Sequence, residues 1–247
     1  QTLTALRQFG KIVEAKHSPM EWPQLKPTAW LIMECYPESP HLSPEELAKL
    51  PDRARRNYQE GSVPGPLSEK SFGKLVAAIG DRREGAFFRY ALAGWVSVDE
   101  DISPELNNSQ KEQLFDTYLS VVSDPQSPEL VRRECGDIAT RLLQREHRRI
   151  IYSDDAVKDL MRTGTPERRR ALDTLLASGE ISLTAKTRER LAPWRQRATE
   201  FQKVLVRVKD DEREPQSLKD QATKSLAWLA HSLLLRDSDP AAKRPKD

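Results

Sequence analysis

The sequence predicts an all-α protein built as a stack of helical hairpins. In one segment after another, apolar residues recur at three- and four-residue spacing, which is the period of one helix face. Long runs that alternate apolar and polar residues, the pattern of half-buried strands, are absent. Hydrophobic residues make up 37% of the chain and charged residues 32%. That balance suits a thin helical stack with much exposed surface.

The clearest hairpin runs from Leu114 to Leu143. Its first helix should end before Asp124-Pro125, because proline cannot continue a helix. Its second helix should open at Ser127-Pro128-Glu129, with the serine as N-cap, the proline at the first helical position and the glutamate at the positive end of the dipole. One face of this second helix is apolar and comprises Val131, Cys135, Ile138, Ala139 and Leu142. Neither helix buries enough apolar surface alone, so the pair must pack on neighbours.

Three further segments have the same layout. The upstream copy places Leu75, Val76 and Ile79 before Asp81 and opens its second helix at Phe88-Arg89. The third copy places Val157, Leu160 and Met161 before Thr165-Pro166-Glu167, followed by Arg168, Ala171, Leu172 and Leu175. The last copy places Phe201, Val204, Leu205 and Val208 before Asp211, followed by Leu218-Lys219 and a helix over about Ser217 to Leu235.

The segments between these copies also carry signals. Asn107-Asn108-Ser109 should cap the helix that leads into the central pair. The run from Arg145 to Arg149 is expected to be a basic link after that pair, and Thr184 to Trp194 predicts an additional helix between the third and fourth copies.

Asp124-Pro125, Val131-Arg132 and the small residue Cys135 together resemble the turn and second-helix start of a HEAT repeat. The resemblance covers about residues 70–235 and implies an α-α superhelix of the HEAT or armadillo-like α-solenoid kind. The basic positions Arg89, Arg132, Arg168 and Lys219 are 43, 36 and 51 residues apart, against about 40–47 in such units. The alternative is an irregular all-helical domain unrelated to that family.

The resemblance implies that a basic residue near the start of each second helix braces the aspartate of the preceding turn. The positions concerned are Asp81, Arg89, Asp124, Arg132, Arg168, Asp211 and Lys219. On this interpretation these residues are structural, and Arg132→Ala should cost stability rather than binding.

The chain divides into residues 1–66, residues 67–235 and residues 236–247. The first part holds a helix over residues 1–18 and nine of the 17 prolines. Five of them should break residues 19–42 into short pieces packed on the repeats: Pro19, Pro23, Pro27, Pro37 and Pro40. Ala29 to Tyr36 is helix or strand, Ser43-Pro44-Glu45-Glu46 is a strong helix start, and residues 61–66 form a boundary loop. The second part is the helical repeat domain, and we expect the charged tail to be disordered.

Trp22 and Trp30 lie in the proline-rich part. They either form a docking surface for a partner or fasten the N-terminal arm to the first repeat. The second role is the usual one for tryptophan.

No pattern for reaction chemistry is present. The four histidines are far apart, no cysteine pair has zinc spacing, and neither a glycine-rich phosphate loop nor a nucleophile elbow occurs. No catalytic, cofactor-binding or metal-ligating residue is therefore predicted, and no cofactor. The chain also has no apolar run long enough to span a membrane.

Two functions fit these observations. The first is a non-catalytic scaffold or adaptor that mediates protein–protein interaction with a partner of unknown identity. The alternative is a nucleic-acid-binding HEAT-like protein that uses a ridge of arginines, although the net charge is only +2 and the two signs are interleaved. The candidate binding residues recur near turns and helix starts: Arg82, Arg83, Arg133, Arg148, Arg149, Arg169 and Arg170. Pairing with neighbouring acids is the competing interpretation for these arginines.

The compartment and the oligomeric state stay open. The sequence begins at Gln1 without an initiator methionine, which fits an exported (periplasmic or secreted) mature protein as well as a trimmed chain. Cys35 and Cys135 either form a disulfide or remain two buried thiols, and the second is favoured because Cys135 lies on an apolar helix face.

Overall fold

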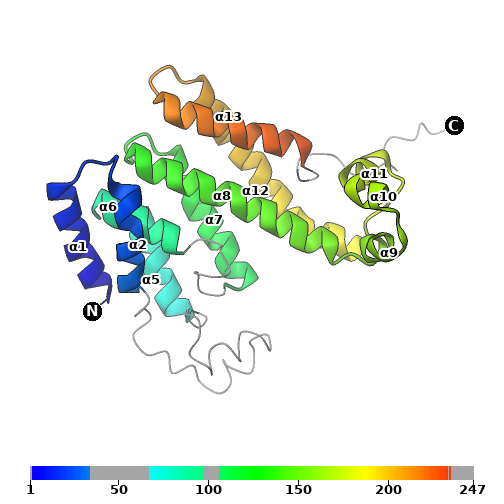
Figure 1. Ribbon diagram of the computed structural model, residues 1–247, viewed down its shortest axis with the longest axis horizontal. Helices are drawn as coiled ribbons and strands as arrows, with labels where there is room; N and C mark the ends of the chain where they lie inside the picture. The colour runs from blue at the N-terminus through cyan, green and yellow to red at the C-terminus, as the bar shows by residue number, and fades with distance from the viewer. Residues whose placement is uncertain (1, 34–66, 97–105, 233, 235–247) are drawn as a thin grey trace. The chain divides into compact units, whose positions relative to one another are not determined.

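A computed structural model describes residues 2–33, 67–96, 106–232 and 234 (Figure 1). About 80% of these residues are helical, in eleven helices, and no strand occurs among them. The all-α prediction is confirmed. The chain divides into two compact units, Gln1–Ala139 and Thr140–Asp247. The division lies inside one helix, α8 (Glu129–Tyr152).

The first unit is centred on α5 (Glu69–Gly80), α6 (Ala86–Trp95) and α7 (Asn108–Ser123). Helix α5 packs against both α6 and α7. It begins after Ser68, whose Oγ accepts a hydrogen bond from the amide of Ser71. Every residue of α6 from Phe87 to Trp95 is buried, which is the pattern of a helix enclosed on all sides.

The predicted central pair is confirmed as α7 and the first half of α8. Asn107 caps α7 in a capping box with Gln110, as its sequence indicated. The predicted cap of α8 is wrong. The Ser127 hydroxyl donates to Asp124 Oδ2 inside the turn, and the helix starts only at Glu129, after Pro128.

The N-terminal arm comprises α1 (Thr2–Lys16) and α2 (Trp22–Met33), which pack on each other and on α6 (Figure 1). The expected break of residues 19–42 at each proline is wrong for α2, because this helix continues through Pro27. Buried residues on both sides of the proline, Trp22, Ala29 and Met33, hold the helix against its neighbours. This packing offsets the one backbone hydrogen bond that proline removes.

Both tryptophans of the arm contact α6. The Trp22 ring meets the ring of Phe87 edge-on, with centroids 5.6 Å apart. The Trp30 indole Nε1–H donates to the carbonyl of Ala91 at 3.1 Å. Both tryptophans thus fasten the arm to α6, as the second interpretation predicted for them.

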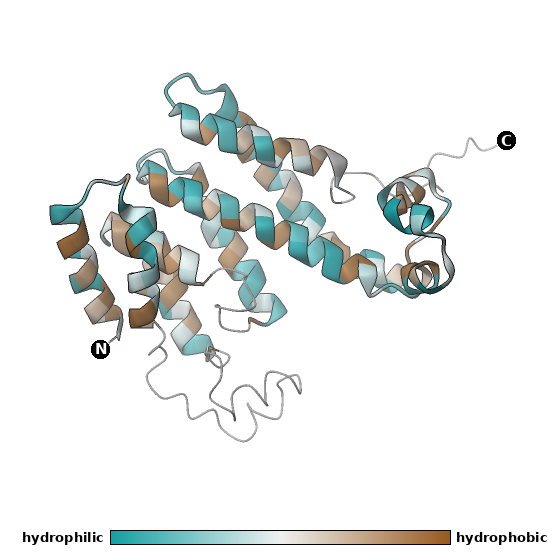
Figure 2. Ribbon diagram, viewed as in Figure 1, coloured by the Kyte–Doolittle hydropathy of each residue, from teal (hydrophilic) through white to brown (hydrophobic). Residues whose placement is uncertain are grey.

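The second unit contains the rest of α8 with α9 (Asp155–Thr163), α10 (Pro166–Arg170), α11 (Leu172–Ser178), α12 (Ala185–Asp210) and α13 (Gln216–His231). Helices α12 and α13 pack on each other, and α10 packs on α9 and α11. Figure 2 shows apolar and hydrophilic residues in alternating bands along α8 and α12, as expected for helices with one buried face.

Two predicted boundaries in this unit are wrong. The run from Arg145 to Arg149 is helical, because the buried face of α8 continues to Ile150 and Ile151. The additional helix predicted from Thr184 to Trp194 is the first part of α12, which continues through Pro193. Its buried face runs on without interruption along Leu191, Trp194, Ala198, Phe201, Leu205 and Val208.

The third predicted hairpin is only partly formed as expected. The second helix begins after Thr165, whose side chain caps α10. The second helix, however, is interrupted at Ala171, so that α10 has five residues and α11 has seven. Helix α11 ends at Gly179, which takes the left-handed conformation with φ 79°.

Several predictions fall on residues that the structure does not describe. These are the helix start at residues 43–46, the loop at residues 61–66, the domain boundaries near residues 66 and 236, Cys35, and the tail at residues 236–247. Cys135 is a buried free thiol, and burial raises its pKa. None of the described helices has the length and apolar character that crossing a membrane requires.

Candidate interaction surface

Three turns in the described residues share one geometry, at Asp81, Asp124 and Asp211. Each aspartate follows the last residue of a helix. Its Oδ1 accepts a hydrogen bond from the amide two residues later, over 2.9 Å at Asp81, 3.0 Å at Asp124 and 3.0 Å at Asp211. The amide three residues later donates to the carbonyl of the same aspartate. Each aspartate therefore folds its own turn, because its short side chain imitates a backbone acceptor.

Neighbouring cations keep these carboxylates charged. The guanidinium of Arg83 donates to Asp81 and that of Arg213 donates to Asp211, and these hydrogen bonds lower the pKa of both aspartates to about 2. Partial burial raises the pKa of Asp124, but hydrogen bonds from Ser127, Gln126 and Arg82 outweigh it, and the pKa is lowered.

A buried arginine follows each of the first two turns. Arg89 is 2% exposed and Arg132 is 3% exposed. The Nε of Arg89 donates to the carbonyl of Ile79 at 2.8 Å, and the Nε of Arg132 donates to the carbonyl of Val122 at 3.1 Å. Both carbonyls belong to the last turn of a helix, where no backbone partner exists and where the dipole is negative.

The bracing role implied by the resemblance therefore needs a correction at Arg89. This side chain bonds the carbonyl of Ile79 and the hydroxyl of Ser127, whereas the carboxylate of Asp81 pairs with Arg83. Burial lowers the pKa of Arg89, and the charges of Asp124 and Asp81 counteract part of that effect.

The first two turns are bonded to each other. Arg89 Nη2 donates to Ser127 Oγ at 3.1 Å, and Ser127 Oγ donates to Asp124 Oδ2 at 2.8 Å. On the outside, Arg82 Nη2 lies 2.6 Å from Asp124 Oδ1. The α5–α6 hairpin is thus joined to the α7–α8 turn by one buried and one exposed connection.

Two of the predicted basic positions differ from these arginines. Arg168 is exposed on α10, and its guanidinium makes no hydrogen bond or ion pair with any residue in the described part of the chain. Lys219 is half-buried and acts on Asp211 only through its charge. A buried arginine that bonds a helix-end carbonyl is therefore found after the turns at Asp81 and Asp124.

The seven candidate binding arginines are divided between the two units. Arg82 and Arg83 pair with Asp124 and Asp81. Arg149 pairs with Glu146, and Arg169 donates to the carbonyl of Met161. Pairing with acids thus accounts for three of the seven.

The remaining three candidates differ in exposure. Arg133 is half-buried and has contacts of its own. Arg148 and Arg170 are exposed, and neither forms an ion pair with the residues described here.

Sequence reasoning missed a polar layer between the arm and α6. Lys26 Nζ pairs with Glu134 Oε1 at 2.8 Å and lies 4.6 Å from the centre of the Tyr90 ring. Glycine at position 94 leaves room for this ion pair, because a Cβ there would lie 2.9 Å from Oε1 of Glu134. Lys26 and Glu134 are 108 positions apart, so no local pattern could have revealed the pair.

The arm also caps α6. Glu14 Oε1 on α1 accepts a hydrogen bond from the amide of Phe87, in the first turn of α6, at 2.7 Å. The residue before this helix is Gly85, and a Cβ at that position would lie 2.7 Å from Glu14 Oε1. Glycine here makes room for a cap that comes from another helix.

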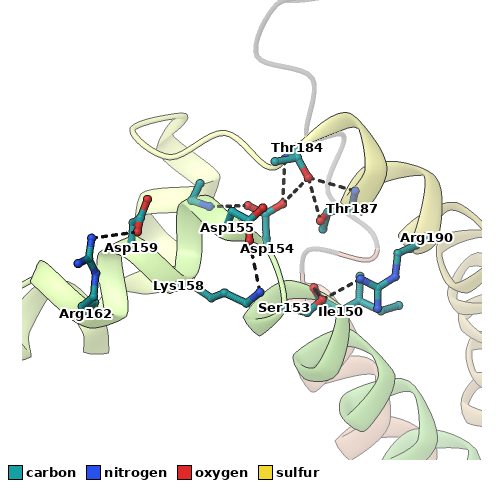
Figure 3. Close-up of polar contacts among 11 residues, drawn as sticks. Ile150, Ser153, Asp154, Asp155, Lys158, Asp159, Arg162, Thr184, Thr187 and Arg190 are labelled. Carbon is teal, nitrogen blue, oxygen red and sulfur yellow. Dashed lines mark hydrogen bonds and ion pairs between the residues drawn. The ribbon is translucent and has the colours of Figure 1, made fainter. Parts of the chain in front are cut away.

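A second missed feature is the buried carboxylate of Asp154, which is 1% exposed (Figure 3). Its oxygens accept hydrogen bonds from the amide of Ala156 at 3.0 Å and from the amide and hydroxyl of Thr184 at 2.9 and 2.8 Å. Burial raises the pKa of Asp154, but bonds from Thr187, Thr184 and Ala156 outweigh it and the pKa is lowered. Asp154 therefore joins the start of α9 to the start of α12.

His147 on α8 is buried in the second unit beside the ring of Trp228 on α13, with ring centroids 6.5 Å apart. Its Nε2 makes no hydrogen bond within the described part of the chain. Burial lowers the pKa of His147 to about 4, with Arg148 and Arg195 acting in the same direction and Asp173 against it. The imidazole is therefore neutral near pH 7.

No group of three or more His, Cys, Asp or Glu side chains in the described residues is placed to hold a metal ion. The polar contacts described above are helix caps, helix-end bonds and turn contacts. No protein-family model, no curated protein and no solved structure matches this chain.

Proposed function

We propose that this chain is a non-catalytic, HEAT-like helical-repeat scaffold that binds another protein. The observation that carries the proposal is the bonding between successive turns through Arg89, Ser127 and Asp124, together with the Arg82–Asp124 pair. Repeat proteins gain their stability from such nearest-neighbour contacts between similar units.

The spacing of the aspartate turns supports the same proposal. Asp81 and Asp124 are 43 positions apart, and Asp211 follows 87 positions later, close to twice that interval. Units of the HEAT and armadillo kind run about 40–47 residues. The interval without an aspartate turn holds the short helices α9, α10 and α11, which on this proposal form a degenerate repeat.

The contact face for a protein partner is the outer side of the α1–α2 hairpin. Ile12, Met20 and Leu31 are 52%, 89% and 60% exposed, and they are the large exposed apolar residues in the described part of the first unit. Exposed apolar side chains on a fixed framework are a common means of protein recognition. Around the turns, by contrast, the charges are paired within the chain.

Site-specific photo-crosslinking tests this function. A photoreactive residue at Met20 should capture a partner from lysate of the source cell, whereas the same group at Gln8, an exposed polar position of α1, should not. The captured protein is then purified and titrated against Leu31→Ser, with Gln24→Ser as the matched control on α2. Loss of affinity in the first variant alone supports the proposal. Equal capture at both positions, or equal affinity of both variants, would refute it.

A further inference from the structure

The charge of the chain is divided unequally between its two units. Counted in the sequence, Gln1–Ala139 carries 16 Lys and Arg against 21 Asp and Glu, a net charge of −5. Thr140–Asp247 carries 24 against 17, a net charge of +7. The balance of +2 for the whole chain thus conceals a basic unit, and a basic unit attracts polyanions.

Five of the cations in the second unit have no acidic partner among the described residues. Arg148, Arg168, Arg170, Lys186 and Arg188 are all exposed, and none forms an ion pair with a residue that the structure describes. The exposed arginines of the first two turns differ, because acids of the same unit neutralise them. Only unpaired cations gain fully from an external anion, since a paired cation must first give up its partner.

The fold brings these five residues toward one end of the second unit. Asp154 at the start of α9 bonds Thr184, the cap of α12, and Arg190 of α12 donates to Ser153 after the end of α8 at 2.8 Å (Figure 3). Lys186 and Arg188 are therefore close to the C-terminal end of α8, which carries Arg148. Helix α9 has nine residues, which span about 14 Å, and it leads to α10 with Arg168 and Arg170 (Figure 1).

We propose that these five side chains bind the phosphate backbone of double-helical nucleic acid, without reading its sequence. Guanidinium groups match phosphate oxygens in geometry and charge. Proteins that bind a single strand also use exposed rings on which bases stack, and Tyr152 is the only exposed large aromatic residue in the described part of the second unit. This inference does not depend on the proposed protein partner.

Fluorescence anisotropy of the full chain with a short labelled DNA duplex of mixed sequence tests the inference. Five phosphate contacts should give a slope of roughly −4 to −5 for log K against log salt concentration, at about 0.9 per contact. Arg168→Gln with Arg170→Gln should reduce the slope by about 2 and weaken binding at least about tenfold at low salt. The double variant Lys186→Gln with Arg188→Gln should reduce the slope and the affinity by the same amounts. Either double variant can therefore test the inference if the other fails to fold.

The matched control is Arg82→Gln with Arg83→Gln, which removes two exposed arginines that already have acidic partners. It should leave the affinity for the duplex within about twofold of the parent. The inference is wrong if the parent does not bind the duplex at low salt, or if the control pair loses as much affinity as the other two. It is equally wrong if a single strand, or vesicles of anionic phospholipid, bind as tightly as the duplex.

Discussion

Arg89 joins the end of α5 to the turn that precedes α8. Its guanidinium donates one hydrogen bond to the carbonyl of Ile79 and one to the hydroxyl of Ser127, and the side chain is 2% exposed. In Arg89→Ala both bonds are lost, and the carbonyl of Ile79 keeps no charged donor. Bonds to a charged group contribute about 1.5–3 kcal/mol each.

The loss is partly offset, because the variant no longer buries a charge. We therefore expect Arg89→Ala to lower the free energy of unfolding by about 3 kcal/mol. At roughly 2–4 °C per kcal/mol for a chain of this size, the melting temperature of the first unit should fall by about 10 °C. Far-UV circular dichroism during thermal and urea unfolding measures the change.

Arg83→Ala is the matched control. Arg83 belongs to the same turn, but its side chain is 91% exposed and it pairs with Asp81 at the surface. Exposed pairs contribute about 0–1 kcal/mol, so this variant should unfold close to the parent. Arg132→Ala, which loses the bond to the carbonyl of Val122, should follow Arg89→Ala in direction. Equal unfolding midpoints for Arg89→Ala and Arg83→Ala would refute the bracing role.

Three further predictions concern the other missed contacts. Glu14→Ala should lower the free energy of unfolding by about 1 kcal/mol. The loss should be smaller in a Gly85→Ala background, because the new Cβ already displaces the carboxylate. Additive effects of the two substitutions in a double-mutant cycle would contradict this prediction. Asp154→Asn should lower the free energy of unfolding by about 2 kcal/mol, because the amide group of the asparagine places a donor opposite the donors of Thr184. An unchanged midpoint of urea unfolding would contradict this prediction. The pKa of His147 is lowered from 6.5 to about 4, so between these two pH values the unfolded chain binds a proton that the folded chain does not. The free energy of unfolding should therefore fall by up to about 3 kcal/mol as the pH drops from 6.5 to about 4. In His147→Leu this part of the pH dependence should disappear from denaturant titrations, and an unaltered pH profile would contradict the assignment.

Helix identity was predictable where apolar spacing and local caps agree. Asn107 with Gln110, Thr165, and the apolar face from Val131 to Leu142 act within one or two turns of the chain, so their signals are contained in short segments. The proline signals were less reliable. Pro27 and Pro193 lie inside helices, since a continuous buried face outweighs the loss of one backbone hydrogen bond.

The partners of charged residues were not predictable. The acids that neutralise Arg82 and Arg83 are Asp124 and Asp81, whereas Glu84 pairs with Arg7, 77 positions away. In a chain where 32% of residues are charged, each arginine has several acids within reach in sequence. Helix packing decides which of them it meets.

The sequence by itself determined that the described part of the chain is helical, where several of its helices begin, and that aspartate turns recur along it. These properties follow from the helical period and from short-range capping, which neighbouring residues settle among themselves. Only the tertiary structure decided that Arg89 bonds a helix end and the next turn, that Glu14 caps a distant helix, and which acids neutralise Arg82 and Arg83. Such contacts join residues far apart in sequence, and they exist only once the helices are packed.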